Sequence, residues 1–315
     1  MTDKTVFITG ACSFVGKSLL RFLLENNVYR KIIACCRSLE KTTGFEKEPV
    51  EFVTADLTNP ETYLSHFKKY RPDHVIHLAA MARYRQGEEA PELTMRTNFL
   101  GSVALLDLAG EYKVEKFLYV SSNLARNPKG ITGFSKYLTE AYIQYKDLDT
   151  DVVSVRLPNV IDSPGAVTLI FKKQIEEGSP ITITDERMSR KFITPEAAAH
   201  QLIFVLEHGK NKDIFINNRP STPIVELARE MIRRSGREIP VKFIGMRPGE
   251  KLQEEDYPEE TIKRTSHPEL FLLTENQHTK NQLEEILKKT GEKTGKTFME
   301  EINKVLHFYK LLAQS

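Results

Sequence analysis

The sequence contains no tryptophan, and neither sign of charge is in excess. Lys and Arg number 45 against 43 Asp and Glu, which leaves a formal net charge of +2 at pH 7. This balance argues against a nucleic-acid partner and against attachment to a membrane surface by bulk charge. No apolar run approaches about eighteen residues and no charged-then-apolar leader is present, so we expect neither a transmembrane helix nor a signal peptide.

Cysteine is also scarce, with only three residues in the chain. Cys35 and Cys36 are adjacent at the end of a predicted strand, and Cys12 stands in a turn that contains glycine. The three residues have neither metal-site nor disulfide spacing. This usage indicates a reducing, cytoplasmic location. The histidines also lack metal-ligand spacing, so we expect no metal site.

The first twenty residues carry the most informative stretch of the chain. The β-branched, apolar run 5–9 meets a turn of small residues and passes directly into a helical apolar pattern. In a dinucleotide-binding βαβ unit, such a turn lets backbone N–H groups approach a pyrophosphate at the positive end of the helix. The usual middle glycine is a serine here, and an ordinary strand-to-helix turn is the alternative for this stretch alone. The cofactor-binding candidates of the stretch are Gly10, Ser13, Phe14, Val15 and Gly16.

Strands and helices alternate over the first half of the chain. Further strands are predicted at 31–36, 50–57, 74–80, 116–122 and 152–157, with helices around 61–69 and 93–110. This alternation predicts a Rossmann-type, doubly wound parallel α/β sheet with right-handed crossovers. We expect a dinucleotide-binding domain at 1–156 and a smaller C-terminal, substrate-binding lobe at 157–315. Part of 190–220 should return to the first domain, and two terminal helices from about residue 280 should pack on the smaller lobe.

Ligands of open α/β sheets bind outside the carboxyl ends of the strands, and those ends supply further cofactor-binding candidates. Arg37 follows the second strand, where a basic residue accommodates the 2′-phosphate of NADP and a carboxylate would bind the ribose hydroxyl of NAD. It favours NADP, with NAD possible and a solvated loop cation as the alternative. The other candidates at strand ends and in the helix after the fourth strand are Ser38, Asp56, Leu57, Leu78, Ala79, Ala80 and Asn98.

Nine segments spread over most of the chain resemble one protein family in both order and spacing. They are ITGACSFVGK, ADL, HLAA, TN, VSSNLARNP, GFSK, RLPNV, ITITDERMSRKFIT and MRPGEKLQEE. Together they resemble the extended short-chain dehydrogenase/reductase superfamily, and within it the polysaccharide-biosynthesis branch that contains UDP-N-acetylglucosamine 4,6-dehydratases. The last two segments discriminate this branch best from generic nucleotide-sugar epimerases.

The resemblance implies a UDP-sugar substrate, and it implies homo-oligomers. The substrate-binding residues that it indicates are Asn159, Arg190, Arg247 and Glu250. A UDP-sugar carries a diphosphate, and Arg190, Arg247 and Lys251 supply positive charge suited to phosphate oxygens. Each of these cations, taken singly, has an ordinary surface residue as its alternative.

The catalytic segments depart from the family pattern. The superfamily has a Tyr four residues before an essential Lys; Lys136 fits that Lys, but Thr132 stands in place of the Tyr and cannot act as a phenolate base. The dehydratases read Ser/Thr-Asp-Lys after the fifth strand, where this chain reads Ser122-Asn123-Leu124. Asn123 can donate a hydrogen bond but has no proton to give, and Leu124 has no acid–base function. Both groups that normally carry out the elimination are therefore missing.

Two interpretations follow from these departures. In the first, the protein is an atypical, NAD(P)-dependent lyase that converts UDP-N-acetylglucosamine to a UDP-4-keto-6-deoxy sugar. Lys136 then orients the nicotinamide ribose, Ser122 and Thr132 hydrogen-bond the C4 oxygen, and Tyr84 and Glu88 are candidates for the missing acid–base groups, with plain loop residues as their alternative. In the second, the elimination is lost, and the fold serves an NADP-dependent nucleotide-sugar reductase, an epimerase or a non-catalytic UDP-sugar binder. The completeness of the cofactor loop, of Lys136 and of the UDP-side segments argues against the non-catalytic binder, and of the remaining activities we favour the dehydratase.

Overall fold

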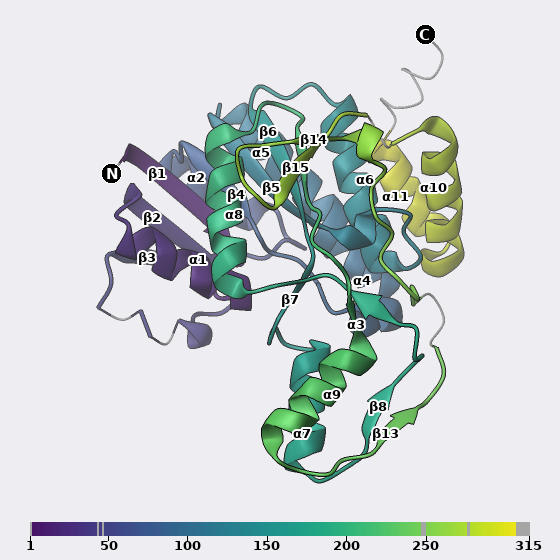
Figure 1. Ribbon diagram of the computed structural model, residues 1–315. Coiled ribbons are helices and arrows are strands. Elements are labelled where there is room, and N and C mark those ends of the chain that lie inside the picture. The colour runs from purple at the N-terminus through teal and green to yellow at the C-terminus, as the bar shows by residue number, and fades with distance from the viewer. Residues whose placement is uncertain (1, 43, 46, 247–249, 276–277, 307–315) are drawn as a thin grey trace.

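A nine-stranded sheet forms the centre of the molecule (Figure 1). The computed structural model describes residues 2–42, 44–45, 47–246, 250–275 and 278–306. In order across the sheet, the strands are β14 (Ile262–Arg264), β15 (Leu270–Leu273), β11 (Ile214–Asn217), β6 (Asp151–Leu157), β5 (Lys116–Ser122), β4 (His74–His77), β1 (Thr2–Thr9), β2 (Tyr29–Cys36) and β3 (Val50–Thr54). All neighbours from β11 to β3 pair in parallel, and β15 and β14 add an antiparallel edge. The predicted doubly wound parallel sheet is confirmed.

Helices cover both faces of this sheet, which explains why its strands are apolar without alternation. On β1, Phe7 points into one core, while Val6 and Ile8 point into the other. One face is covered by α1 (Phe14–Glu25) and α8 (Pro195–His208), and the other by α2 (Glu61–Tyr70), α5 (Gly101–Glu111) and α6 (Ile131–Tyr145). The carboxyl ends of the parallel strands therefore share one edge, where a ligand can bind.

The single helix predicted around 93–110 is divided in the structure. It consists of α4 (Pro91–Met95), the π-helical turn η2 (Arg96–Leu100) and α5. A Cβ on Gly101 would collide with the backbone oxygen of Leu57, so a glycine is needed where the helix meets the loop after β3. Periodicity alone does not reveal a π-helical turn, since it shifts the helical register by a single residue.

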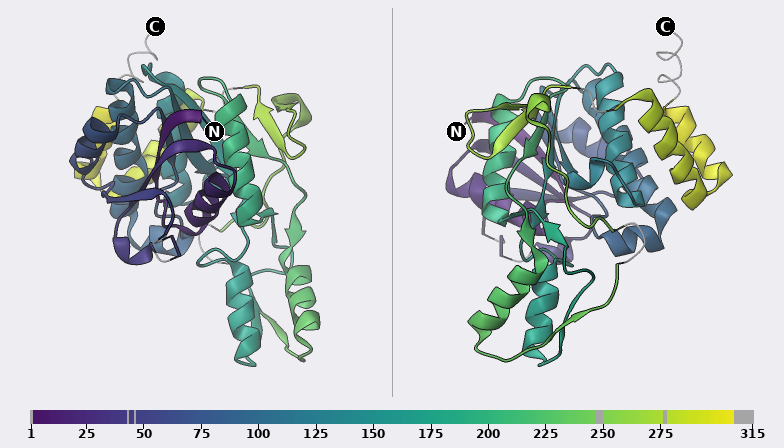
Figure 2. Two further views of the ribbon diagram at one scale, coloured as in Figure 1. Left: turned by 90° about the vertical axis from the view of Figure 1, so that its left-hand side faces the viewer. Right: turned by 45° about the vertical axis from the view of Figure 1, so that its right-hand side comes forward.

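The smaller lobe projects away from the sheet (Figure 2). It contains α7 (Val167–Glu176) and α9 (Ile224–Ser235), beside the parallel pair β8 (Ile181–Ile183) and β13 (Val241–Phe243). Phe171, Ile181 and Ala228 belong to its own hydrophobic core. The remaining elements are short: η1 (Leu39–Lys41), α3 (Tyr84–Glu89), η3 (Asn123–Ala125), β7 (Asn159–Val160), β9 (Ser189–Arg190), β10 (Phe192–Ile193), β12 (Thr222–Pro223) and η4 (Glu259–Thr261).

The two terminal helices do not pack on the smaller lobe, so that expectation was wrong. Leu283 and Ile286 of α10 (Lys280–Thr294) and Phe298 and Ile302 of α11 (Lys296–Val305) are buried in the sheet domain's core, together with α6. Figure 1 shows both helices beside α6, far from α7 and α9. An amphipathic pattern shows that one face of a helix is buried but not against what. Here β14 and β15 lead the chain back to the sheet before the helices begin.

Candidate active site

The turn between β1 and α1 is shaped by close backbone contacts. Gly10 has a φ of 69°, in the left-handed region, and a Cβ there would lie 2.7 Å from the backbone nitrogen of Ala79. A Cβ on Gly16 would collide with the backbone oxygens of Gly10 and Ala11. Ser13 has a φ of −72°, which needs no glycine, and its hydroxyl accepts a hydrogen bond from the Gly16 N–H at 3.1 Å. The serine therefore caps α1, and α1 carries no acidic residue in its first turn that would repel an anion.

A disulfide joins Cys12 in this turn to Cys36 at the end of β2, with 5.6 Å between the two Cα atoms. This overturns the expectation that the cysteines lack disulfide spacing. Thr9 and Cys35 are paired across the parallel strands, so the residues just beyond these positions are neighbours although 24 residues separate them in the chain. The sequence separation therefore gave no sign of the bond. The bond ties the glycine turn to the strand end that Arg37 follows.

The candidates after β2 and β3 lie at the expected strand ends. Arg37 is exposed, and the Ser38 hydroxyl caps the short helix η1. The Asp56 carboxylate accepts hydrogen bonds from the Thr58 N–H and hydroxyl, both at 2.8 Å, and so stabilises its own turn. Leu57 is buried against α5. Of these four residues, Arg37 is the one whose side chain extends into solvent.

Asn98 holds the loop that follows β4. Its side-chain oxygen accepts a hydrogen bond from the Met81 N–H at 2.7 Å, and its amide donates to the Met81 carbonyl at 3.0 Å and to Ser135 at 3.2 Å. The side chain is fully buried. Asn98 thus fixes the path of the segment just beyond Leu78–Ala80, which the glycine turn approaches.

Lys136 is buried on α6 beside the end of β5. Its ammonium donates to the Val120 carbonyl at 2.8 Å and lies 4.8 Å from the centroid of the Tyr119 ring. Burial lowers the pKa of Lys136 to about 8, against an opposing contribution from Glu140. Ser122 ends the same strand and accepts a hydrogen bond from the Leu124 N–H at 3.3 Å. Lys136 and Ser122 therefore both lie near the carboxyl end of β5.

A buried ion pair that the sequence analysis missed lies behind Lys136. Arg156 of β6 binds both oxygens of Glu140, with a shortest distance of 2.6 Å, and donates to the Tyr257 hydroxyl at 2.9 Å. His278 contacts the same carboxylate at 3.1 Å, and Ser121 donates to it. Burial raises the pKa of Glu140, but the charge of Arg156 and the hydrogen bonds outweigh it and keep the carboxyl ionised. The sequence signal for this ion pair was Arg156 itself, a charged residue inside the mostly apolar strand β6.

Helix α3 covers the first turn of α6, where Thr132 lies. Thr132 is 2% exposed, and a Cβ on Gly87 would collide with its hydroxyl. Within the described part of the chain this hydroxyl has no hydrogen-bond partner. Burial first, and then Glu88 and Glu250, raise the pKa of Tyr84 to about 12. Tyr84 is therefore a neutral phenol near pH 7.

Glu88 stabilises the start of α6. One carboxylate oxygen accepts a hydrogen bond from the Ile131 N–H at 2.6 Å, and the other pairs with Lys293 of α10. Gly130, the N-cap residue of α6, has no side chain that could accept this hydrogen bond. Glu88 therefore works as a helix cap that also binds α10.

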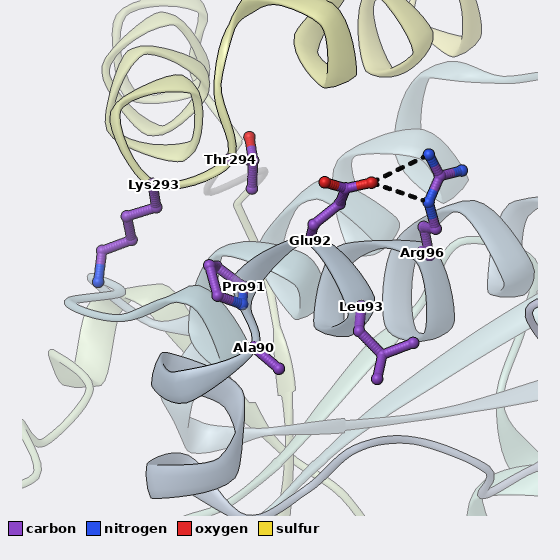
Figure 3. A pocket seen from close by; sticks show the side chains of 7 residues that line it. All are labelled: Ala90, Pro91, Glu92, Leu93, Arg96, Lys293 and Thr294. Atoms are coloured by element: carbon purple, nitrogen blue, oxygen red, sulfur yellow. Dashed lines mark hydrogen bonds and ion pairs between the residues drawn. The ribbon is translucent and has the colours of Figure 1, made fainter.

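A pocket lies beside this ion pair, between α4 and the end of α10 (Figure 3). Its lining residues are Ala90, Pro91, Glu92, Leu93, Arg96, Lys293 and Thr294. None of these lining residues is a predicted site residue.

Of the predicted substrate-binding residues, Asn159 belongs to a side-chain cluster around Glu254. The two oxygens of Glu254 accept hydrogen bonds from the amides of Asn123, at 2.8 Å, and Asn159, at 2.6 Å. Lys251 donates to the Arg126 carbonyl. These residues except Asn159 line a small pocket, together with Tyr257 and Glu255. Glu254 was not among the predicted residues, and its sequence neighbourhood, QEE after the Lys251 segment, was the only available signal.

Arg190 binds the backbone of the segment that carries Lys251 and Glu254. Its guanidinium donates to the carbonyls of Ser189 and Lys251, each at 2.7 Å, and to that of Leu252 at 3.2 Å. Burial lowers its pKa, and Glu254 and Glu250 oppose that change. Arg190 therefore positions the segment that carries Lys251 and Glu254. Arg247 lies outside the described residues.

The described residues offer neither a metal site nor a helix that could span a membrane. No group of three or more His, Cys, Asp or Glu side chains there could hold a metal ion. None of the helices there combines the length and apolarity that crossing a bilayer requires.

Comparisons with known proteins agree with this architecture. Residues 6–275 match the model of a family described as polysaccharide biosynthesis protein. The chain is 34% identical over 281 residues to the capsular polysaccharide biosynthesis protein CapD of Staphylococcus aureus, which covers 81% of this chain and 45% of that protein. It is 30% identical to a protein of Rickettsia canadensis named UDP-glucose 4-epimerase, over 79% of this chain and 76% of the other. The structure of Pen from Bacillus thuringiensis superimposes with a TM-score of 0.79 at 28% identity, over 86% of this chain and 89% of that one. The chain spans about half the length of the polysaccharide biosynthesis relatives that it matches.

Proposed function

The chain belongs to the polysaccharide biosynthesis protein family, within the extended short-chain dehydrogenase/reductase superfamily, and from that premise we propose that it modifies a nucleotide sugar. Specifically, we propose an NADP-dependent UDP-N-acetylglucosamine 4,6-dehydratase. The observation that carries this proposal is the position of Lys136, buried with a pKa lowered to about 8 at the sheet edge that also carries the Gly10–Gly16 turn. A lysine held there can orient a nicotinamide ribose and assist proton transfer.

The residues of the glycine turn suit a dinucleotide. Positions 10 and 16 leave no room for a Cβ, and the capped start of α1 presents backbone N–H groups to a pyrophosphate. When bound, the nicotinamide cofactor supplies the hydride chemistry by accepting a hydride from the sugar and returning it. The exposed Arg37 after β2, where a carboxylate would mark NAD, supports NADP.

The chain's own residues then bind and orient the sugar. Ser122, at the end of β5, donates a hydrogen bond to the C4 oxygen in this proposal. Thr132 lies under Gly87, so its hydroxyl reaches the sugar only when α3 is displaced. Asn159 binds Glu254, and the charge of Glu250 acts on Arg190. In this proposal the nucleotide part of the substrate binds beside these residues.

A UDP-sugar 4-epimerase is the second candidate. Two observations favour it: the Rickettsia relative carries that name, and Asn123 and Leu124 stand where the dehydratases have an acid and a base. An epimerase needs the hydride transfer and Lys136 but no elimination.

One incubation separates the candidates. The purified protein is given UDP-N-acetylglucosamine and catalytic NADP⁺ in deuterated water, and the product is read by mass spectrometry and proton NMR. A dehydratase yields loss of one water and a new 6-methyl signal, whereas an epimerase yields a product of unchanged composition with inverted C4. Unchanged substrate in the presence of bound cofactor contradicts both.

A further inference from the structure

The elimination step needs two groups that the family's usual positions do not supply here. A base must remove the C5 proton, and an acid must protonate the oxygen that departs from C6. Asn123 and Leu124 can do neither. Tyr84 is a neutral phenol whose pKa is raised to about 12, and Glu88 is engaged in capping α6 and binding Lys293.

A carboxylate and an amine from a later segment of the chain, Glu254 and Lys251, nonetheless lie beside Asn123. Glu254 lies 2.8 Å from the amide of Asn123, the residue that replaces the family's acid, although 131 residues separate the two in the chain. Lys251 binds the backbone carbonyl of Arg126, three residues further on, and shares the pocket with Glu254 and Asn123. Arg190 holds both residues' segment in place through the carbonyls of Lys251 and Leu252.

We propose that Glu254 is the base and Lys251 the acid of the elimination. Both residues lie in the segment between β13 and η4. This inference rests on the proposed dehydratase function and assigns its missing residues. Asn123 keeps a role as the donor that orients Glu254.

The hydrogen bonds and burial suit these two roles. Glu254 accepts hydrogen bonds from two amides, Asn123 at 2.8 Å and Asn159 at 2.6 Å, and these two contacts fix the direction of its carboxylate. Burial lowers the pKa of Lys251 to about 8, against the charges of Glu255 and Glu254, so its ammonium can release a proton near neutral pH. A 4-keto group beside C5 makes the C5 proton acidic enough for a carboxylate to remove.

The step balances with these two groups alone. Glu254 takes the C5 proton, and the C–H electron pair moves into the enolate of the 4-keto group. The enolate electron pair then forms the C5–C6 double bond as the C6–O bond breaks. The departing oxygen takes a proton from the Lys251 ammonium and leaves as water. When a hydride reaches C6, Glu254 returns its proton to C5, and the Lys251 amine regains a proton from solvent.

The test uses the full-length protein loaded with NADP⁺ in deuterated water, with UDP-N-acetylglucosamine as the substrate. Glu254→Gln keeps the hydrogen-bonding shape but cannot act as a base, and Lys251→Arg keeps the charge but cannot release a proton near neutral pH. Formation of the 6-methyl product should fall by about 100-fold or more in both variants. Substrate recovered from Lys251→Arg should carry deuterium at C5, whereas that from Glu254→Gln should not. Glu285→Gln, in which an exposed carboxylate of α10 that pairs with Lys289 is lost, is the matched control and should react like the wild type.

Binding separates a catalytic role from a structural one. Calorimetric titration with UDP, without cofactor, should give the same affinity for the wild type, Glu254→Gln and Lys251→Arg. If either variant forms the 6-methyl product at the wild-type rate, or loses it only in proportion to weakened UDP binding, the assignment of that residue is overturned. If the wild type itself forms no 6-methyl product, the proposed function fails. A 4-keto product released by Glu254→Gln, with the dehydrated product absent, shows that oxidation at C4 survives and that only the elimination has been removed.

Discussion

At the ends of β1 and β2, the site is built from backbone contacts, whereas beyond β5 it is built from side chains that meet across the chain. Gly10 approaches the backbone of Ala79, and a Cβ would not fit there. At the other end, Glu254 joins Asn123 and Asn159, which lie 131 and 95 residues away in sequence. The first kind of site tolerates few residue types, so it keeps a recognisable pattern. The second can be rebuilt from a different segment while the fold is unchanged.

The largest change in stability is expected at the buried ion pair between Arg156 and Glu140, near the end of the site that is built from side chains. Arg156→Met leaves the Glu140 carboxylate buried without its main partner, which should lower the free energy of unfolding by about 3–5 kcal/mol. Urea denaturation followed by circular dichroism measures this. Arg156→Met combined with Glu140→Leu should recover much of the loss. A loss below about 1 kcal/mol in the single variant would show that the pair does not hold this end together.

The disulfide is the corresponding link at the backbone end. Without a reductant, Cys36→Ser should lower the free energy of unfolding by about 3 kcal/mol, because the bond between Cys12 and Cys36 restricts the unfolded chain. With a reductant, wild type and variant should differ little. Mass spectrometry after alkylation of the denatured, unreduced protein should find Cys35 alkylated and the other two blocked. Alkylation of all three cysteines would contradict a disulfide between Cys12 and Cys36.

A pair of glycine variants tests the close approach itself. Gly10 and Gly178 have φ values of 69° and 67°, but a Cβ at Gly178 meets nothing within 4 Å. Gly178→Ala should cost about 1–2 kcal/mol of stability for its left-handed backbone alone. Gly10→Ala should cost a further 1–3 kcal/mol or so, because its Cβ also meets Ala79, and it should weaken NADP⁺ binding. Equal costs in thermal denaturation would mean that the turn has room to relax.

The smallest effect concerns Lys136 and pH. Burial lowers its pKa from 10.5 to about 8, so between these values the unfolded chain binds more protons than the native one. Native stability should therefore rise with pH in that window, and the contribution is absent in Lys136→Met. From pH 8 to about pH 9, the stability of the wild type relative to this variant should increase by about 1 kcal/mol. A difference that stays constant, or that shrinks as pH rises, would mean that Lys136 is not buried as an ammonium.

The same contrast explains what the sequence predicted. The strand–turn–helix at the start and the parallel sheet follow from local patterns, because apolar periodicity and the small residues of a turn can be read from neighbouring positions. Lys136 was indicated by the family resemblance. The disulfide was missed because parallel pairing, and not sequence spacing, brings Cys12 beside Cys36. The terminal helices were placed on the wrong lobe for a related reason, since their destination depends on β14 and β15.

The candidate catalytic groups were hardest to predict. Tyr84 and Glu88 were chosen for their position after the fourth strand, and the structure shows Glu88 capping α6. Glu254 follows a familiar segment, but only the folded chain brings it to Asn123. A departure from a motif thus identifies the position where a function is missing, and three-dimensional proximity is needed to find what replaces it.

The most direct test compares the two ends of the site in one experiment. Cofactor-loaded Lys136→Ala and Glu254→Gln are each mixed with UDP-N-acetylglucosamine, and the absorbance of reduced nicotinamide is followed over time. We expect no absorbance from Lys136→Ala, a brief rise in the wild type, and a rise that persists in Glu254→Gln, because oxidation proceeds and elimination does not. If Glu254→Gln shows the same brief rise as the wild type, or no rise at all, the division of the site into a hydride-transfer end and a rebuilt elimination end is contradicted.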